Sequence, residues 1–309
     1  MKTTPENQIM SLNPEKKNRD SMVVHMSYYT TPVIKLTQNN SIHDALLIMQ
    51  KNEIKRIVIA DNDVPLGIVT ERDVGNFLEK DKTNRTLDEI SLSQIMTKNP
   101  VTITMGQDDH LIQCAIRMET FQICAVIVVD SDGKLVGITT KSDLVKNFAN
   151  LYTGIYKVKD YMTKKLITCR KSDSLLYVLN MLNKNKIARI VVTDSYGKPI
   201  GVVTYDLFMK YSEYFKHEKR AGTRDYLLPK DSNKETQIGE LLGNGLLTVE
   251  SEEDLAKAAK LMSLYKVSGI PTVDKEGNLE GVISSTDITR AYSEVEIHSR
   301  LIKKDPHFV

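Results

Sequence analysis

A short pattern that occurs four times limits the possible folds of this chain more than any other feature. The copies read GIVTERDV, GITTKSDL, GVVTYDL and GVISSTDI, and they begin at Gly67, Gly137, Gly201 and Gly281. Successive glycines are 70, 64 and 80 residues apart. Repetition at such a period indicates that one folding unit of about 60 residues is used four times.

Each copy of the motif ends a longer pattern of helix and hairpin. Upstream of each glycine, apolar residues follow the i, i+3, i+4, i+7 spacing of a helix that buries one face. The four sets are Ile42, Ala45, Leu46, Met49; Leu111, Cys114, Ala115, Met118; Leu175, Val178, Leu179, Leu182; and Leu255, Ala258, Ala259, Met262. After each helix comes a β-branched run with turn residues, such as AVIVVDSDGKLVGIT, which predicts a β-hairpin. The predicted unit is therefore α+β, in the order β-α-β-β-α, with its second helix starting at the Thr or Ser of the motif.

A leading segment stands before the first strand of each unit. The four leading segments are SYYTTPVI, IMTKNPVT, YMTKKLIT and LLGNGLLT. A three-stranded sheet with helices on one face leaves its other face uncovered, so we expect the units to pair. The predicted organisation begins with a polar N-terminal segment, 1–27, and ends with a C-terminal tail, 296–309. Between them lies a first module, 28–150, made of units 28–85 and 92–150. It is followed by a second module, 151–295, made of units 156–213 and 238–295 with a basic linker, 214–237, between them.

Charge and composition exclude several classes of protein. The 42 Lys and Arg nearly balance the 40 Asp and Glu, which leaves a net charge of +2 and no overall attraction to nucleic acid or anionic membranes. Lys216, Lys219, Arg220 and Arg224 form one basic stretch, which we interpret as a solvated linker; an RNA or protein contact is the alternative. No apolar run approaches the roughly 20 residues of a membrane span, and the first residues resemble no signal peptide, so we expect a cytoplasmic protein.

Residues that carry chemistry are scarce. The three cysteines lack CxxC spacing and are expected to be buried and inert. The histidines have no metal-binding spacing, and His43 and His110 fall at helix starts, where exposed or capping roles are expected. No nucleophile elbow, Walker loop or dinucleotide fingerprint occurs. We therefore predict no catalytic residues, no metal and no enzymatic activity.

The repeated motif itself has two interpretations. Ser/Thr-x-x-Asp before an apolar run is a helix capping box, in which hydroxyl and carboxylate bond the backbone N–H groups of the first turn. A helix N-terminus can also bind phosphate, and a carboxylate one turn in can accept the hydroxyls of a ribose. The glycine would let a ligand approach the backbone closely. Capping and ligand binding are compatible, and the residues alone leave both open.

The four motifs, the β-α-β-β-α unit and the pairwise organisation together resemble the cystathionine β-synthase (CBS) domain family. Four such domains would form two Bateman modules, a layout similar to the γ subunit of AMP-activated protein kinase. In this family the Asp binds ribose and the Thr or Ser lies near phosphate, which the resemblance carries over to Thr70 and Asp73, Thr140 and Asp143, and Ser284 and Asp287. The third copy departs, because Thr204 and Asp206 are only two residues apart. One residue of helix is about 100° of rotation, so this site is expected to be empty or to bind differently.

Basic residues near the motifs support a phosphate ligand. Arg56 and Arg189 precede the first hairpin strand in units one and three, whereas Ala125 and Gly269 stand at the matching places. The family resemblance implies that such an arginine contacts phosphate, for which a forked guanidinium is suited; an exposed arginine paired with a neighbouring acid is the alternative. Arg72 and Lys141, near the aspartates, would add positive charge at the helix starts.

The resemblance implies a regulatory protein that binds an adenosyl ligand between paired units and acts on a partner protein. AMP, ADP, ATP and S-adenosylmethionine share the adenosine that the aspartates would bind. A ligand-free interaction scaffold and a nucleic-acid-binding regulator are the alternatives. One chain could close into a disc of four units, or two chains could pair; the sequence leaves this open.

Overall fold

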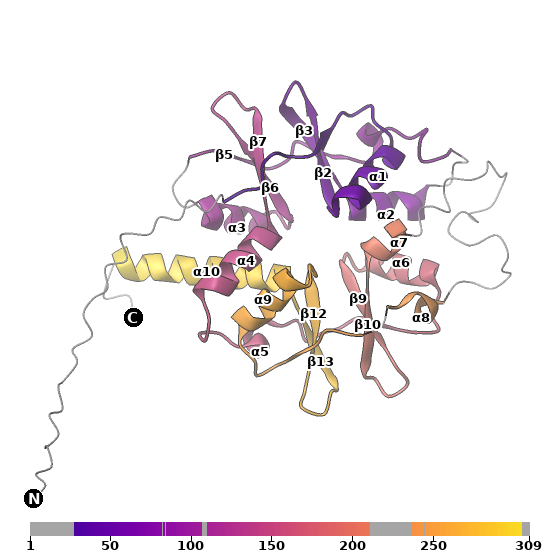
Figure 1. Cartoon of the computed structure of the whole chain (residues 1–309), viewed down its shortest axis with the longest axis vertical. Helices are drawn as coiled ribbons and strands as arrows, with labels where there is room; N and C mark the ends of the chain where they lie inside the picture. The colour runs from indigo at the N-terminus through magenta and orange to yellow at the C-terminus, as the bar shows by residue number, and fades with distance from the viewer. Residues whose placement is uncertain are drawn as a thin grey trace, which may run out of the picture.

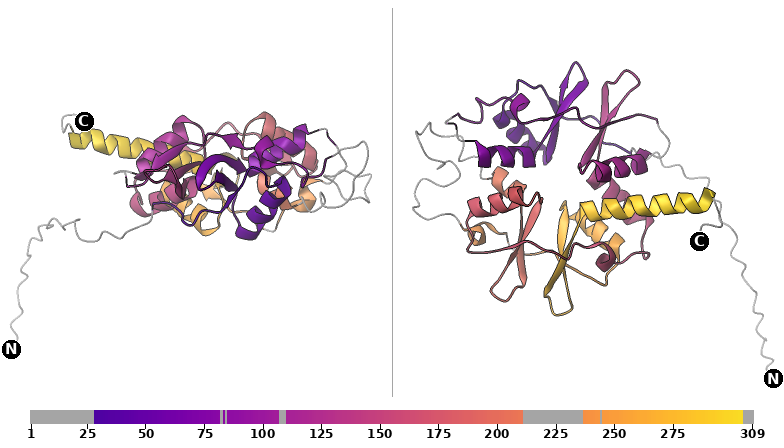
Figure 2. Two further views of the ribbon diagram at one scale, coloured as in Figure 1. Left: turned by 90° about the horizontal axis from the view of Figure 1, so that it is seen from above. Right: turned by 180° about the vertical axis from the view of Figure 1, so that it is seen from behind.

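The four units lie around a common centre and form a flattened ring (Figures 1 and 2). The computed structural model describes residues 28–81, 83, 85–106, 110–210, 237–243 and 245–304. The predicted N-terminal segment 1–27 lies outside the described residues, as do Lys216, Lys219, Arg220 and Arg224 and almost all of the predicted linker.

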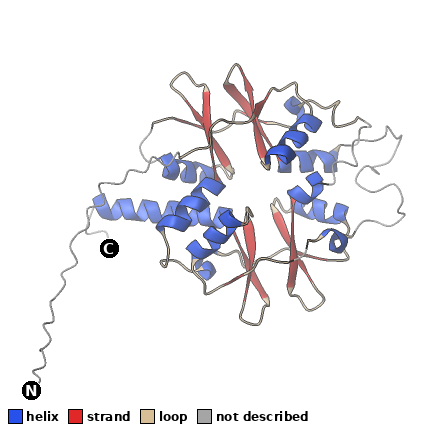
Figure 3. Ribbon diagram, viewed as in Figure 1, coloured by secondary structure: helices blue, strands red, loops and turns tan. Residues whose placement is uncertain are grey.

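Each unit has the predicted order of elements, and the α+β fold is confirmed (Figure 3). Unit 1 contains β1 (Lys35–Leu36), α1 (Ile42–Asn52), β2 (Arg56–Asp61), β3 (Val64–Thr70) and α2 (Glu71–Lys80). Unit 2 contains the 3-10 helix η1 (Leu92–Gln94), β4 (Thr97–Lys98), β5 (Thr102–Thr104), α3 (His110–Thr120), β6 (Ala125–Val129), β7 (Leu135–Thr140) and α4 (Lys141–Leu151). Unit 3 contains α5 (Val158–Tyr161), β8 (Thr168–Arg170), α6 (Leu175–Lys184), β9 (Arg189–Thr193), β10 (Pro199–Thr204) and α7 (Tyr205–Lys210). Unit 4 contains α8 (Ile238–Leu241), β11 (Val249–Glu250), α9 (Leu255–Leu264), β12 (Gly269–Val273), β13 (Leu279–Ser284) and α10 (Ser285–Lys304), which continues into the predicted tail 296–309.

The strand pairing places the motif at the same point of every unit. In each sheet the first strand runs parallel to the first strand of the hairpin, and the hairpin itself is antiparallel. The motif Thr or Ser lies opposite the first residue of the hairpin in all four units, in the pairs Arg56–Thr70, Ala125–Thr140, Arg189–Thr204 and Gly269–Ser284. The two positions singled out in the sequence are therefore cross-strand neighbours, at the end of the sheet where the second helix begins.

The predicted helix faces form the core. All sixteen apolar positions of the four first helices are buried. In the first module the uncovered sheet faces pack together, as expected: Val58 of unit 1 lies in one cluster with Ala125, Ile127 and Ile138 of unit 2. Burial of these faces removes apolar surface from water at about 25 cal/mol per Å², which explains why the units occur in pairs.

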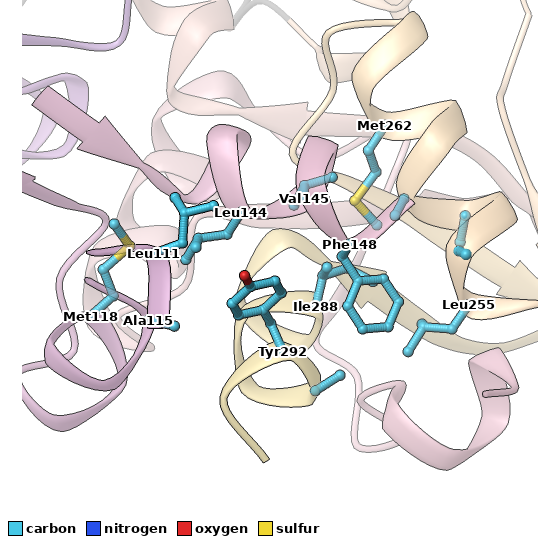
Figure 4. Close-up of a cluster of buried hydrophobic side chains, with 14 of the residues drawn as sticks. Leu111, Ala115, Met118, Leu144, Val145, Phe148, Leu255, Met262, Ile288 and Tyr292 are labelled. Carbon is cyan, nitrogen blue, oxygen red and sulfur yellow. The ribbon is translucent and has the colours of Figure 1, made fainter. Parts of the chain in front are cut away.

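Helices join the two modules. α4 of unit 2 packs on α9 and α10 of unit 4, and α2 of unit 1 packs on α6 and α7 of unit 3. Figure 4 shows the first of these interfaces, where Phe148 and Tyr292 lie among Leu144, Leu255 and Ile288. The second helices of the units, which start at the motifs, consequently face the middle of the ring (Figure 1).

Candidate functional site

Three of the four motifs form the expected capping box. The backbone N–H of Thr70 donates to Oδ2 of Asp73 at 2.8 Å, and the Thr70 hydroxyl donates to the same oxygen at 2.6 Å. The corresponding distances are 2.7 and 2.7 Å for Thr140 and Asp143, and 2.9 and 2.6 Å for Ser284 and Asp287. The three-residue spacing produces this geometry because Ncap and N3 face each other across the first turn.

The cap occupies only one oxygen of each carboxylate. Within the part of the chain that the structure describes, no hydrogen bond reaches Oδ1 of Asp73 or Asp143. Burial raises the pKa of Asp73, and the hydrogen bonds from Thr70 and the charge of Arg72 only partly offset this effect. A half-buried carboxylate with an unused oxygen can accept ligand hydroxyls while its other oxygen holds the helix start. The two interpretations of the motif are compatible in this geometry.

The motif glycines have a different neighbour from the one expected. We interpreted them as room for a ligand, but in the structure the leading segment of the paired unit lies over each one. A Cβ at Gly67 would be 2.9 Å from Sδ of Met96, and one at Gly281 would be 2.8 Å from Sδ of Met162. Tyr29 and Leu242 lie in the same way over Gly137 and Gly201. Each leading segment therefore belongs to the site of its partner unit.

Basic side chains from both modules gather near the motifs. Arg189 of unit 3 extends into unit 4, where its Nη2 donates to the Ser268 hydroxyl at 3.0 Å and its Nε lies 2.6 Å from a Cβ placed on Gly269. Glycine at 269 thus makes room for the arginine. Lys141 of unit 2 donates to the Thr286 hydroxyl of unit 4 at 2.9 Å.

The pKa shifts of Lys141 and Arg189 reflect the positive charges around them. Burial lowers the pKa of Lys141, and the charges of Arg189 and Arg56 lower it further. Burial also lowers the pKa of Arg189 to about 10; Asp287 opposes the shift and Arg72 adds to it. With a pKa of about 10, Arg189 stays cationic at neutral pH. The Nε atoms of Arg56 and Arg189 are buried without a hydrogen-bond partner, so the structure holds positive charge that an anion could compensate. We call Arg56, Arg72, Lys141 and Arg189 the central basic cluster.

The third motif keeps its strand register, and α7 begins directly after Thr204, as the other second helices begin directly after their Thr or Ser. Thr204 pairs with Arg189 in the same register as the other three copies, so the missing residue falls after the strand. Tyr205, which follows Thr204 directly, is buried with 3% of its surface exposed. Asp206 is partly buried on the first turn of α7.

The fourth motif has additional neighbours that the sequence did not reveal. Oδ1 of Asp287 lies 3.5 Å from the Thr163 hydroxyl and 3.8 Å from Nη2 of Arg290. Arg290 also donates to the Tyr161 carbonyl and lies over the ring of that residue. Beside this contact is a cavity of about 350 Å³ lined by Tyr156, Asp160, Tyr161, Arg290 and Glu294.

The role expected for His110 is wrong, and the buried, inert role expected for the cysteines is confirmed in part. His110 is buried rather than exposed or capping; its Nε2 lies 2.9 Å from the Thr139 hydroxyl, which donates to the Tyr28 carbonyl. It ties the leading segment of unit 1 to the motif strand of unit 2. Cys114 and Cys169 are buried, and burial raises the pKa of these thiols to about 11 and about 12, which leaves them unreactive. Cys124 is only partly buried.

No helix in the described ranges has both the length and the apolar character needed to cross a membrane. No group of three or more His, Cys, Asp or Glu side chains in those ranges is arranged to hold a metal ion.

Paired units, exchanged leading segments and capped Asp residues together define a protein made of CBS domains, and sequence comparison assigns the chain to the same family. The CBS domain profile matches residues 25–80, 92–150, 158–214 and 238–294, so this chain belongs to the CBS domain family.

Among the relatives are two uncharacterized proteins of Methanocaldococcus jannaschii. MJ1404 is 26% identical over 291 residues, which cover 90% of this chain but only 65% of MJ1404. MJ1225 is 23% identical over 288 residues, which cover 84% of this chain and 99% of MJ1225.

Two solved structures share the fold of this chain. The crystal structure of MJ1225, described as a candidate archaeal homologue of γ-AMPK, has a TM-score of 0.75 at 21% identity and covers 87% of this chain and 99% of its own. An uncharacterized Pyrococcus horikoshii protein has a TM-score of 0.59 at 17% identity, with 86% and 97% covered. The prediction of four CBS domains in two Bateman modules is confirmed.

Proposed function

We propose that this chain is a non-catalytic regulatory protein that binds adenine nucleotides or related adenosyl ligands between paired CBS units and signals to a partner protein. The observation that carries the proposal is the arrangement at Asp73 and Asp143. There the helix cap leaves Oδ1 of each carboxylate unused, and Arg56, the cross-strand neighbour of Thr70, has a buried Nε without a hydrogen-bond partner. An unused carboxylate oxygen can accept hydrogen bonds from ribose hydroxyls, and an unpartnered guanidinium N–H can donate to a phosphate.

The residues divide into two roles under this proposal. Asp73, Asp143 and Asp287 accept ribose hydroxyls, with Thr70, Thr140 and Ser284 at the helix starts near phosphate. The central basic cluster binds the phosphates. Because Arg189 extends into unit 4, it serves the site of Asp287 rather than that of its own unit. Thr204 and Asp206 form an altered site that stays empty or binds differently.

Regulation follows if the ligand favours one arrangement of the units. The cluster takes cations from both modules, so an anion there contacts both. A ligand shifts an equilibrium between two arrangements of the modules only if it binds one arrangement more tightly than the other. An anion that contacts both modules would bind most tightly to the arrangement that brings their cations together. AMP, ADP, ATP and S-adenosylmethionine are the ligands to compare.

The test is thermal unfolding with each of these ligands and with GTP. A ligand at a hundred times its Kd stabilises the folded state by about 2.7 kcal/mol, and we expect Asp73→Ala, Asp143→Ala or Asp287→Ala to reduce that shift. Asp44→Ala is the matched control, because Asp44 forms the same capping box with Ser41 on α1, outside the motifs. Loss of either box destabilises the ligand-free protein by about 1 kcal/mol, but only the motif variants lose ligand stabilisation.

Two results would contradict the proposal. One is the absence of a shift with every adenosyl ligand, which would favour an interaction scaffold whose motifs only cap helices. The other is an equal loss of the shift in Asp44→Ala and in the motif variants, which would reduce the aspartates to structural groups.

Phosphate binding is tested separately with Arg56→Ala. Removal of one charge-assisted contact costs about 1.5–3 kcal/mol, roughly ten- to a hundredfold in affinity. We expect this loss for AMP and little change for adenosine, measured by isothermal titration calorimetry. Arg85→Ala, an exposed arginine that bonds Gln94, is the control. Equal losses for AMP and adenosine would exclude a phosphate contact at Arg56.

A further inference from the structure

The hairpin of unit 4 begins at two small residues, Ser268 and Gly269, and an arginine of unit 3 lies on them. A Cβ placed on Gly269 would be 2.6 Å from Nε of Arg189 and 2.8 Å from its Cδ and Cζ. Gly269 is directly opposite Ser284 in the hairpin, and opposite residues of an antiparallel pair place their side chains on the same face of the sheet. The guanidinium therefore lies beside the Ser284 side chain, where the fourth motif begins.

Ser268 connects this arginine to the helix of the fourth motif. Its hydroxyl accepts a hydrogen bond from Nη2 of Arg189 at 3.0 Å. Its backbone carbonyl accepts one from the backbone N–H of Ser285 at 2.9 Å. Ser285 is the first residue of α10, and Asp287 lies in the first turn of that helix. Ser268 thus contacts both the arginine and the helix start that carries the aspartate.

The matching places in module 1 have different residues. Cys124 stands where unit 4 has Ser268, and Ala125 stands where it has Gly269. A thiol is a weaker hydrogen-bond acceptor than a hydroxyl, and the alanine methyl fills the space that the arginine uses in unit 4. Arg56, the arginine of unit 1, therefore cannot be held in the same way. The pair of a serine and a glycine is specific to the fourth site.

We propose that Ser268 is a positioning residue for the fourth site: it holds the Arg189 guanidinium beside Ser284, ready for the phosphate of a nucleoside whose ribose is bound by Asp287. The inference rests on the proposed function. An arginine held in its bound position loses less conformational entropy when the ligand arrives. Its Nε is buried without a hydrogen-bond partner, so this donor remains for a phosphate oxygen. Unit 3 then contributes its arginine to the site of unit 4.

The experiment isolates the fourth site in an Asp73→Ala/Asp143→Ala background, which leaves Asp287 intact, and measures AMP and adenosine binding by isothermal titration calorimetry. Ser268→Ala removes the hydroxyl and leaves the backbone bond to α10. We expect AMP to bind roughly three- to tenfold more weakly, the net effect of one hydrogen bond, with adenosine unchanged. Ser293→Ala is the matched control, since Ser293 is a buried serine of α10 whose hydroxyl bonds to a carboxylate of α3.

A second pair of variants separates positioning from direct contact. In an Arg189→Ala background, Ser268→Ala should have no further effect on AMP binding, because the residue that the serine positions is gone. A further loss in that background would show that the serine hydroxyl binds the phosphate itself, which overturns the inference.

The remaining outcomes distinguish the inference from the proposed function. Equal weakening of AMP and adenosine by Ser268→Ala, no weakening of either, or no AMP binding in the fourth-site background overturns the inference alone. If the unchanged protein binds no adenosyl ligand, the proposed function is overturned together with the inference.

Discussion

Replacement of Gly75 by alanine tests how closely the two modules pack. In a helix interior, Gly→Ala normally adds about 1 kcal/mol of stability. At this position the new Cβ would lie 2.7 Å from two ring carbons of Tyr205. The ring has little freedom to move, because Tyr205 is 3% exposed and its hydroxyl is bonded to Asn183. Overpacking costs about 1–3 kcal/mol; at the upper end of that range, the net change is a loss of about 2 kcal/mol.

Thermal unfolding of single and double variants measures this loss. For a chain of this size 2 kcal/mol corresponds to about 4 °C in Tm. In a Tyr205→Ala background the steric conflict is absent, so Gly75→Ala should become stabilising by about 1 kcal/mol. The reversal of sign is the specific expectation. Stabilisation by Gly75→Ala in the otherwise unchanged protein would refute the close contact between α2 and α7.

Three further predictions concern other contacts. Burial lowers the pKa of His110, and the charge of Arg117 lowers it further, so the stability that the neutral ring provides is complete above pH 6.5 and is lost as the pH falls from 6.5 through the folded-state pKa. The free energy of unfolding of His110→Gln should therefore vary less between pH 6.5 and 5, measured by urea titration. Gly137→Ala places a Cβ 2.2 Å from Cδ2 of Tyr29 and should destabilise by about 1–3 kcal/mol, with the loss relieved in Tyr29→Ala. Arg189→Met removes a buried charge and should raise the ligand-free stability by about 1–2 kcal/mol while it reduces the stabilisation by AMP, because the site of Asp287 is weakened; a variant that keeps the full AMP shift would contradict the role given to the arginine.

Repetition made much of the fold predictable. Each first helix showed the same apolar spacing four times, and every position in those sets is buried. The Thr-to-Asp distance of three residues predicted a capping box, and the structure has one at each motif with that spacing. These features depend on local geometry, since a helix turn and a hairpin register are set by residues close in sequence.

The contacts between units were not predictable in the same way. No local pattern shows that Met96 covers Gly67 or that Arg189 lies on Gly269. His110 was expected to be exposed or to cap its helix because it lies at a helix start, but it is buried beneath the leading segment of another unit. Tyr205 was not singled out at all. A useful signal was present, however: glycine replaces arginine at 269, the position matching Arg189 in the paired unit, and that glycine makes room for the arginine.

The sequence by itself determined the repeated unit, its helices and hairpins, the CBS family and the residues that begin each second helix. The tertiary structure decided which unit covers which motif, that the basic residues of both modules meet, and that Tyr205 of the third copy packs on Gly75 of α2. The physical reason is that periodicity and cap spacing are properties of one short segment. The direction in which one packed unit faces another depends on side-chain shape and burial over the whole interface.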